Sequence, residues 1–408
     1  MALDLDFVRS QFPAFSSPVL SSHAFFENAG GSYPCRQVVD RLTRFYTDRK
    51  VQPYAPYPGA QAGGAEMDEA RDRLAAMMGV AREEVSFGPS TSANTYVLAQ
   101  AVRQWLCGTD GAVMVTNQDH EANSGVWRRL ADEGIEVREW RVDPGTGSLG
   151  PGGLSALLQD GKVRLVCFPH CSNVIAEIND VASISAICRA AGARTVVDGV
   201  SYAPHGFPDV PALGCDVYLF SAYKTFGPHQ GIMVLREAFG FELPGQAHFF
   251  NQGTLYKRHT PAGPDHAQIA ACAGMADYVD ALAARHGITG NAAARNRGVH
   301  DLMRAQEVAA IQPLLDYLGG RNDLRLIGPR DAALRAPTVA VELAGPAEPM
   351  SEELGRRGIA CWAGDFYAVR PLEALGIDRD KGVLRMSAVH YTSAEDVARL
   401  IAALDAVL

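Results

Sequence analysis

Residues 220–235 read FSAYKTFGPHQGIMVL, and they place a lone lysine, Lys224, between an apolar strand and a glycine-containing turn. Similar short β-rich runs alternate with helical patterns through residues 85–240. We expect strands at residues 84–88, 111–117, 135–142, 163–168, 194–199, 217–222 and 231–235. Continuous apolar strands separated by helices predict a mostly parallel sheet with helices on both faces, which is the α/β class.

The pattern changes in the last quarter of the chain. A helical pattern at 265–287 leads out of the α/β region, and an amphipathic helix is expected at 302–320. Strands at 324–328, 338–343 and 382–389, helices at 352–358 and 394–407, and an extended loop between them follow. We therefore predict a large α/β domain over 21–290, a small α+β domain over 291–408, and an N-terminal arm over 1–20 that belongs with the small domain.

Composition narrows the class of protein. The formal net charge is −9 and no block of like charges occurs, which argues against a nucleic-acid or membrane-surface partner. The acidic N-terminus and the lack of a membrane-length apolar run predict a cytoplasmic protein. The eight cysteines are interpreted as reduced core residues, and Cys167, His170 and Cys171 lack the second ligand pair that a metal site needs.

Two charged residues lie at the expected carboxyl ends of neighbouring strands. Lys224 follows the strand at 217–222, with Ser221, Tyr223 and Thr225 around it, and Asp198 ends the strand at 194–199. Separately, the lysine could extend to solvent and the aspartate could cap a helix. Together they match the needs of pyridoxal phosphate, since a desolvated amine holds its aldehyde and a carboxylate keeps its ring nitrogen protonated.

Polar residues at the other strand ends fit the same cofactor. The turn after the first strand carries Ser90, Thr91 and Ser92 and opens a helix, so its N–H groups and hydroxyls favour a phosphate, although ordinary helix caps are the alternative. His120 follows the next strand and could stack on a flat ring. Asn173 follows the strand at 163–168 and could donate to the cofactor's phenolic oxygen or simply form a turn.

These residues belong to motifs in a familiar order: DHEAN at 119–123, SNVIAEIN at 172–179, DGVSYAPH at 198–205 and SAYKTFGP at 221–228. In combination they resemble the class V aminotransferase family of pyridoxal-phosphate enzymes, and within it the cysteine desulfurase and selenocysteine lyase group. The resemblance extends from FFENAGGSYP near the N-terminus to the last helix. It implies the type I fold of pyridoxal-phosphate transferases and a homodimer with sites between subunits.

The resemblance also implies a role for each matching residue. Lys224 would be the covalent anchor of the cofactor and the acid and base for the α-proton, Asp198 the partner of the ring nitrogen, and His120 the stacking residue. The phosphate would be held by Ser90, Thr91, Ser92, Ser221 and Tyr223. Asn173 would lie near the cofactor hydroxyl and the substrate carboxylate, and Arg385 would bind that carboxylate, so the substrate would be a small α-amino acid.

The chain departs from the desulfurase pattern at several positions. Where the family has its nucleophilic cysteine, counting from Gly364, this chain has Tyr367, while Cys361 lies six residues earlier in the same loop and is interpreted as packing. Ser201 replaces a glutamine that contacts the cofactor hydroxyl, and Gly263 replaces a hydroxyl residue expected to cross the dimer interface. We expect Tyr367 and the stretch PYAPYPGAQAGG, at 53–64, to line the substrate site.

Three functions remain open from the sequence. The first is a desulfurase-like lyase that removes the α-proton of a small amino acid and expels a β-substituent, because elimination needs no protein nucleophile. The second is a true aminotransferase, whose pyridoxamine form is productive. The third is a catalytically silent scaffold, against which the joint presence of Lys224, Asp198 and Arg385 argues.

Overall fold

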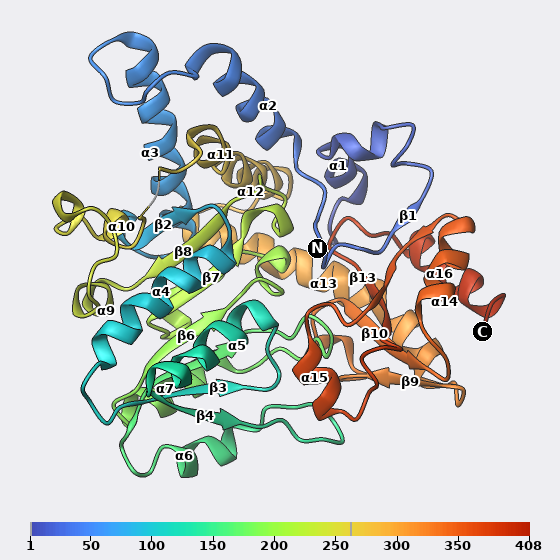
Figure 1. The fold of residues 1–408 in the computed structure, drawn as a ribbon. Helices are drawn as coiled ribbons and strands as arrows, with labels where there is room; N and C mark the ends of the chain where they lie inside the picture. Colours follow the sequence, from blue (N-terminus) through green and yellow to red (C-terminus); the bar gives the residue numbers. More distant parts are fainter. Residues whose placement is uncertain (1, 262) are drawn as a thin grey trace.

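A seven-stranded sheet forms the centre of the molecule in the computed structural model, which describes residues 2–261 and 263–408 (Figure 1). Its spatial order is β2-β8-β7-β6-β5-β3-β4; β8 is antiparallel to both neighbours, and the other pairings are parallel. The strands are β2 Val85–Gly88, β3 Ala112–Thr116, β4 Glu136–Trp140, β5 Val163–Pro169, β6 Arg194–Asp198, β7 Val217–Ser221 and β8 Gly231–Leu235. The predicted α/β class and mostly parallel sheet are confirmed.

The sheet is buried on both faces because its side chains alternate between two apolar layers. In β7, Val217 and Leu219 pack in one hydrophobic cluster, whereas Tyr218 and Phe220 pack in the other. The first layer contains residues of α4 Thr91–Leu106 and α5 Glu121–Arg128. The second contains residues of α3 Pro58–Met78, α7 Val181–Ala190 and α12 Ala273–Arg285.

A second, four-stranded antiparallel sheet lies beside the central one, in the order β12-β13-β10-β9. Its strands are β9 Leu324–Ile327, β10 Thr338–Leu343, β12 Trp362–Gly364 and β13 Val383–Ser387. Residues of α13 Ala292–Gly319, α14 Glu348–Arg356 and α16 Ala394–Asp405 share its apolar core. Figure 1 shows this unit, in orange and red, next to the carboxyl ends of the central strands.

The chain start is tied to this second unit. β1 Ala24–Phe25 pairs in parallel with β11 Ile359–Ala360. In α1 Leu5–Ser10, Arg9 donates to the Tyr391 carbonyl at 3.0 Å and forms an ion pair with Asp396 of α16. Residues near the N-terminus therefore complete the surface around the C-terminal sheet.

Two parts of the structure differ from the sequence expectations. The segment expected as an extended loop contains β11, β12 and α15 Val369–Ala374, elements too short to show a period in the sequence. The stretch 53–64 contains the first turns of α3, and no residue of it lines either cavity described below. The remaining helices are α2 Arg36–Arg44, α6 Leu154–Leu157, α8 Val210–Leu213, α9 Glu237–Glu242, α10 Leu255–Arg258 and α11 His266–Ala271.

No helix among the described residues is both long enough and apolar enough to cross a membrane.

Candidate active site

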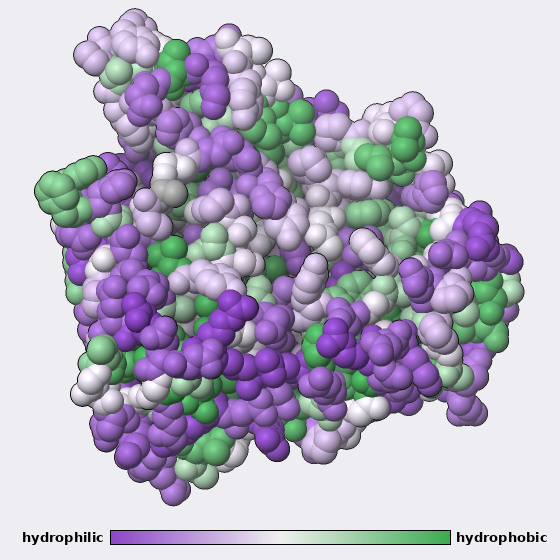
Figure 2. All heavy atoms as spheres, viewed as in Figure 1, coloured by the Kyte–Doolittle hydropathy of each residue, from purple (hydrophilic) through white to green (hydrophobic). Residues whose placement is uncertain are grey.

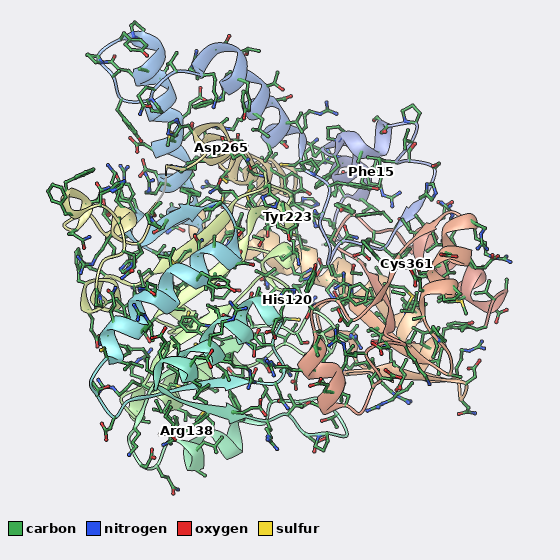
Figure 3. The ribbon with its side chains drawn as sticks, in the orientation of Figure 1. Phe15, His120, Arg138, Tyr223, Asp265 and Cys361 are labelled. Carbon is green, nitrogen blue, oxygen red and sulfur yellow. The ribbon has the colours of Figure 1, made fainter. Side chains whose placement is uncertain are left out.

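Two adjoining cavities lie at the carboxyl ends of the central strands, where open α/β sheets bind ligands. The first, of about 260 Å³, is lined by all ten residues predicted to bind the cofactor; the second, of about 550 Å³, is lined by Arg385 and Tyr367. Both cavities share His120, Asn173, Tyr223 and Lys224. The surface is hollowed in this region (Figure 2), where Figure 3 labels His120 and Tyr223 between the central sheet and the second unit.

Lys224 lies one short turn beyond β7, in the 3₁₀ turn Ala222–Lys224. This turn directs the chain away from the sheet, so the lysine stands where the two cavities meet. Burial lowers the pKa of its amine to about 8, and the positive charge of Arg385 acts in the same direction. An amine with this pKa is partly neutral near physiological pH, which a nucleophile or base requires.

Two buried carboxyl groups face the cofactor cavity without a cationic partner. Asp198 ends β6 and accepts a hydrogen bond from the Val200 N–H at 2.8 Å, and burial raises its pKa to about 6. Asp119 accepts from the Asn123 side-chain amide at 2.7 Å. Burial first, and then the charge of Asp198, raise the pKa of Asp119 well above its ordinary value. No ion pair within the described residues includes either side chain.

The small-residue turn before α4 lies beside the end of β7. The hydroxyls of Thr91 and Ser221 are 2.7 Å apart, and both residues are buried. Ser90 caps α4 by accepting from the Ala93 N–H at 3.1 Å. A Cβ at Gly231 would lie 2.6 Å from the Thr91 nitrogen, so the first residue of β8 must be glycine for the turn to sit this close. The turn thus combines a helix N-terminus with hydroxyl donors.

His120 begins α5 and is held by its own backbone. Its Nδ1 accepts a hydrogen bond from the Ala122 N–H at 3.0 Å, which fixes the ring orientation. Burial lowers its pKa to about 3, with the charges of Lys224 and Arg385 acting the same way. The imidazole is therefore neutral at physiological pH and presents a flat surface to both cavities.

Asn173, Ser201 and Tyr223 complete the wall of the cofactor cavity. The Asn173 amide nitrogen donates to the Phe366 carbonyl at 3.0 Å, whereas its buried Oδ1 has no hydrogen-bond partner. Tyr223 stacks on His229, with ring centroids 4.9 Å apart and planes at 10°. The unpaired Asn173 oxygen is an acceptor left free beside the cavity.

Arg385 is buried in β13 and already has an acidic partner. Its Nη2 donates to Glu27 Oε1 at 2.8 Å, and its Nη1 lies 3.4 Å from the Asn173 carbonyl. The guanidinium carbon lies 3.7 Å from the centroid of the Phe366 ring, a cation–π contact. Arg385 Nε and Glu27 Oε2 are buried and unpaired. One nitrogen of the arginine and one oxygen of the glutamate are thus without a hydrogen bond at this ion pair.

The loop after β12 closes the substrate cavity with aromatic residues. Tyr367 is 72% exposed, and its ring centroid lies 5.6 Å from that of His120. Cys361 instead packs against the core of the second sheet, and burial raises the pKa of its thiol to about 12. Figure 3 shows Cys361 away from His120 and Tyr223, toward the second unit.

The fold and the site together define an α/β enzyme built around a buried lysine. The sequence matches the family "Aminotransferase class-V" over residues 24–400, and the chain belongs to this family. It is therefore a pyridoxal-phosphate enzyme with the type I transferase fold, in line with the resemblance found in the sequence.

Several known proteins are similar over nearly the whole chain. "Aminotransferase-like protein FGM3" of Gibberella zeae is 30% identical over 100% of this chain and 99% of its own length. A "Cysteine desulfurase" of Yersinia pseudotuberculosis is 29% identical over 99% of this chain and 98% of its own. The apo cysteine desulfurase of Thermococcus onnurineus has the same fold, with a TM-score of 0.84 and 21% identity over 100% of this chain and 98% of that one.

One relative is much longer than this chain. The "Nonribosomal peptide synthetase-like enzyme fsqF" of Aspergillus fumigatus is 30% identical over 98% of this chain, but the match covers only 26% of that protein. The family unit therefore also occurs as part of a larger protein.

The residues of the first cavity fit pyridoxal phosphate. Two buried carboxyl groups without cations suit a protonated ring nitrogen, and the turn at Ser90–Ser92 suits a phosphate. The buried Asn173 Oδ1 without a partner suits a hydroxyl donor, and the neutral His120 ring suits a stacked aromatic. These features belong to the protein residues themselves.

Two acidic residues of the site were not predicted from the sequence. Asp119 stands in the DHEAN motif and Glu27 in the FFENAGG motif, yet neither was singled out. A signal for Asp119 was available, since it follows an apolar strand as Asp198 does. Glu27 carried none, because its contact with Arg385 joins residues 358 positions apart.

Proposed function

We propose that the enzyme is a desulfurase-like lyase that removes the α-proton of a small amino acid and expels a substituent from its β-carbon. The observation that carries this proposal is the substrate cavity itself: it brings Lys224 and Arg385 together, while no cysteine is among its described lining residues. Elimination needs a base but no protein nucleophile, so a loop with Tyr367 in the cysteine's place is compatible with it.

The cofactor would be held at three points. Lys224 would bond its aldehyde carbon, Asp198 would pair with its ring nitrogen, and the turn at Ser90–Ser92, with Ser221 and Tyr223, would receive the phosphate. His120 would stack on the ring, with Asn173 and Ser201 near its hydroxyl. When bound, the cofactor supplies an electron sink that stabilises negative charge at the substrate's α-carbon.

The chain's own residues would orient the substrate and move its proton. Arg385 and Asn173 would hold the carboxyl end, so that the Cα–H bond faces Lys224. The amine of Lys224, whose pKa is lowered to about 8, would take this proton, and the leaving group would then depart from the β-carbon. Tyr367 and Phe366 would restrict water at the cavity mouth.

A product assay separates this function from the alternatives. The cofactor-loaded enzyme is mixed with a panel of small amino acids, as free acids and as amides, and the products and recovered cofactor are analysed. Elimination from cysteine consumes one water and gives pyruvate, ammonia and hydrogen sulfide with the cofactor unchanged. Alanine, which lacks a leaving group, serves as the matched control and should give none of these. Alanine formed from cysteine would instead indicate sulfur transfer and contradict the proposal.

A class V aminotransferase is the second candidate, because one 30% identical relative is named aminotransferase-like. In that case alanine and cysteine would both convert the cofactor to its pyridoxamine form, and a keto acid would restore it. A catalytically silent scaffold would show neither reaction.

We also propose that the enzyme acts as a homodimer, as the family resemblance implies. Phe249 and Phe250 are 87% and 69% exposed, an aromatic pair unusual on a surface that remains in water. Sedimentation equilibrium should give twice the chain mass of 43.7 kDa, and the single mass would contradict the dimer.

A further inference from the structure

The substrate cavity contains an ion pair that occupies the residue proposed to bind a carboxylate. Arg385 Nη2 donates to Glu27 Oε1 at 2.8 Å, and both residues line the cavity beside Lys224. A Cβ at Gly30 would lie 2.5 Å from Glu27 Oε1, so the glycine leaves the space in which this carboxylate sits. The Phe366 ring supports the guanidinium from the side. The neighbouring residues therefore fix the positions of both side chains of the ion pair.

Each partner of this ion pair keeps one buried polar atom without a hydrogen bond. Arg385 directs Nη2 to Glu27 and Nη1 to the Asn173 carbonyl, which leaves Nε buried and unpaired. Glu27 Oε2 is likewise buried and unpaired. A carboxylate binds arginine best through two parallel hydrogen bonds, and here a substrate carboxylate would have to share the guanidinium with the Glu27 carboxylate. A carbonyl oxygen needs only one donor, and an amide N–H2 also matches the free acceptor.

The charges around the cavity also favour an uncharged amide or ester group. Its charged lining residues are the cations Lys224 and Arg385 and the anions Glu27 and Asp365, and Glu27 is the anion that pairs with Arg385. Asp365 is itself paired with Arg379 at 3.5 Å. A free substrate carboxylate would place a second negative charge beside Glu27 in a largely desolvated site, whereas an amide or ester adds no charge.

We infer that Glu27 is a specificity-determining residue that makes this cavity prefer an amino-acid derivative with a neutral carboxyl group, such as an amide or ester, over the free acid. This inference rests on the proposed function of the cavity as the site of a small amino acid. In this role, Glu27 is an internal carboxylate that already forms an ion pair with Arg385.

The test compares two ligands of the same size that differ in charge, propionamide and propionate. Neither has an amino group, so neither can react, and the result is independent of elimination or transamination. Binding to the cofactor-loaded enzyme is followed by tryptophan fluorescence, since Trp362 lines the cavity. The wild type should bind propionamide at least about 10-fold more tightly than propionate, and Glu27→Gln should move this ratio at least about 10-fold toward propionate.

Two further variants make the outcome decisive. Glu121→Gln removes the same charge from a residue that is paired with Arg370 at 3.3 Å and does not line the cavity, so it should keep the wild-type ratio. Gly30→Ala keeps the charge but pushes the Glu27 carboxylate away, and it should shift the ratio as Glu27→Gln does, even if Glu27→Gln fails to fold. A wild type that binds propionate as tightly as propionamide, or a ratio unchanged in Gly30→Ala, would overturn the inference.

Discussion

The cofactor cavity and the helical layer that contains α2, α3 and α12 differ in how their charged side chains are paired. In that layer Arg41 is buried and its acidic partners are partly exposed. In that layer α2, α3 and α12 are joined by an arginine cluster of five residues: Arg41, Glu69, Arg73, Asp277 and Asp280. Arg41 donates to Glu69 at 2.7 Å and to Asp277 at 2.6 Å, and Arg73 donates to Asp280 at 2.7 Å. Every charge in this cluster has an opposite charge beside it.

The cofactor cavity leaves its charges without partners. Asp119 and Asp198 are buried, and burial raises the pKa of each by more than the charges of Arg128 and Lys224 lower it. Lys224 likewise has a pKa lowered by burial. A buried charge without a partner is destabilising, so the fold keeps such groups only where a ligand supplies what is missing. The comparison therefore separates residues that stabilise the fold from residues that would bind a ligand. Substitutions in the first group should lower stability and leave cofactor affinity unchanged, whereas substitutions in the second group should lower cofactor affinity and not stability.

The largest effect should come from Lys224→Ala. This change removes the only proposed covalent anchor and base, so turnover should fall by about a thousandfold or more. The cofactor should also become removable by dialysis, as followed by its absorbance. The melting temperature of the cofactor-free protein should not fall, because the removed amine is desolvated. Lys162→Ala, at an exposed lysine on the protein surface, is the control and should behave as the wild type. Retained turnover would contradict the assignment of Lys224.

Asp198→Asn should weaken cofactor binding by about 100-fold or more, because it removes a buried negative charge that faces a cationic ring nitrogen. Equilibrium binding measured by cofactor fluorescence tests this. Asp119→Asn should have a smaller effect, because burial and the charge of Asp198 raise the pKa of Asp119 and so reduce its negative charge. Equal losses in both variants would show that the two carboxyl groups share the charge.

Asp198→Asn should stabilise the cofactor-free protein, and the direction of this effect follows from the pKa of Asp198. The folded-state pKa of Asp198 is about 6 and the unfolded value is about 4, so the folded protein holds this proton more tightly. Stability from this group is therefore lost as pH rises from about 4 to 6, and above pH 6 the carboxylate costs up to about 3 kcal/mol. Denaturant unfolding at pH 7.5 should show Asp198→Asn to be the more stable form, and no gain relative to pH 4 would contradict this account.

Arg41→Ala, in the arginine cluster, should lower stability and leave cofactor affinity unchanged. It removes one of the two arginines that Glu69 and Asp277 share, leaving Arg73, and should lower the free energy of unfolding by about 1 kcal/mol. Cofactor affinity should be unchanged, since the cluster does not line the cavity. Arg141→Ala is a matched control, because this arginine pairs with Glu139 but its side chain is 78% exposed. A loss of cofactor affinity in Arg41→Ala would couple the two regions and remove the contrast.

The cofactor residues that the sequence predicted share one property: each lies at or just beyond the end of an apolar strand. Lys224 and Asp198 could be located because the strands of 217–222 and 194–199 are continuous apolar runs, and the carboxyl ends of parallel strands meet at one edge. All ten proposed cofactor residues line one cavity for this reason. Their chemical roles still await the measurements above.

Other features lay beyond the reach of sequence patterns. The pairing of Glu27 with Arg385 depends on how the N-terminal segment returns to the last sheet, through β1 beside β11. These strands are two residues long and have no period to detect. The stretch 53–64 was also expected at the substrate cavity, whereas it contains the first turns of α3 and lines neither cavity of this chain. Composition alone did not indicate where it lies.

The smallest effect is expected for Cys361→Ser, and it tests whether a cysteine takes part at all. The thiol packs against the core of the second sheet, and burial raises its pKa to about 12, so almost none of it is the reactive thiolate at neutral pH. Turnover of cysteine and of a sulfur-free substrate with a β-leaving group, such as O-acetylserine, should each change by less than about twofold. A selective loss with cysteine would show that Cys361 receives sulfur. Cys361 precedes β12 and Tyr367 lies in the loop after it, so such a loss would mean that β12 and this loop change position during turnover, and elimination would no longer explain the reaction.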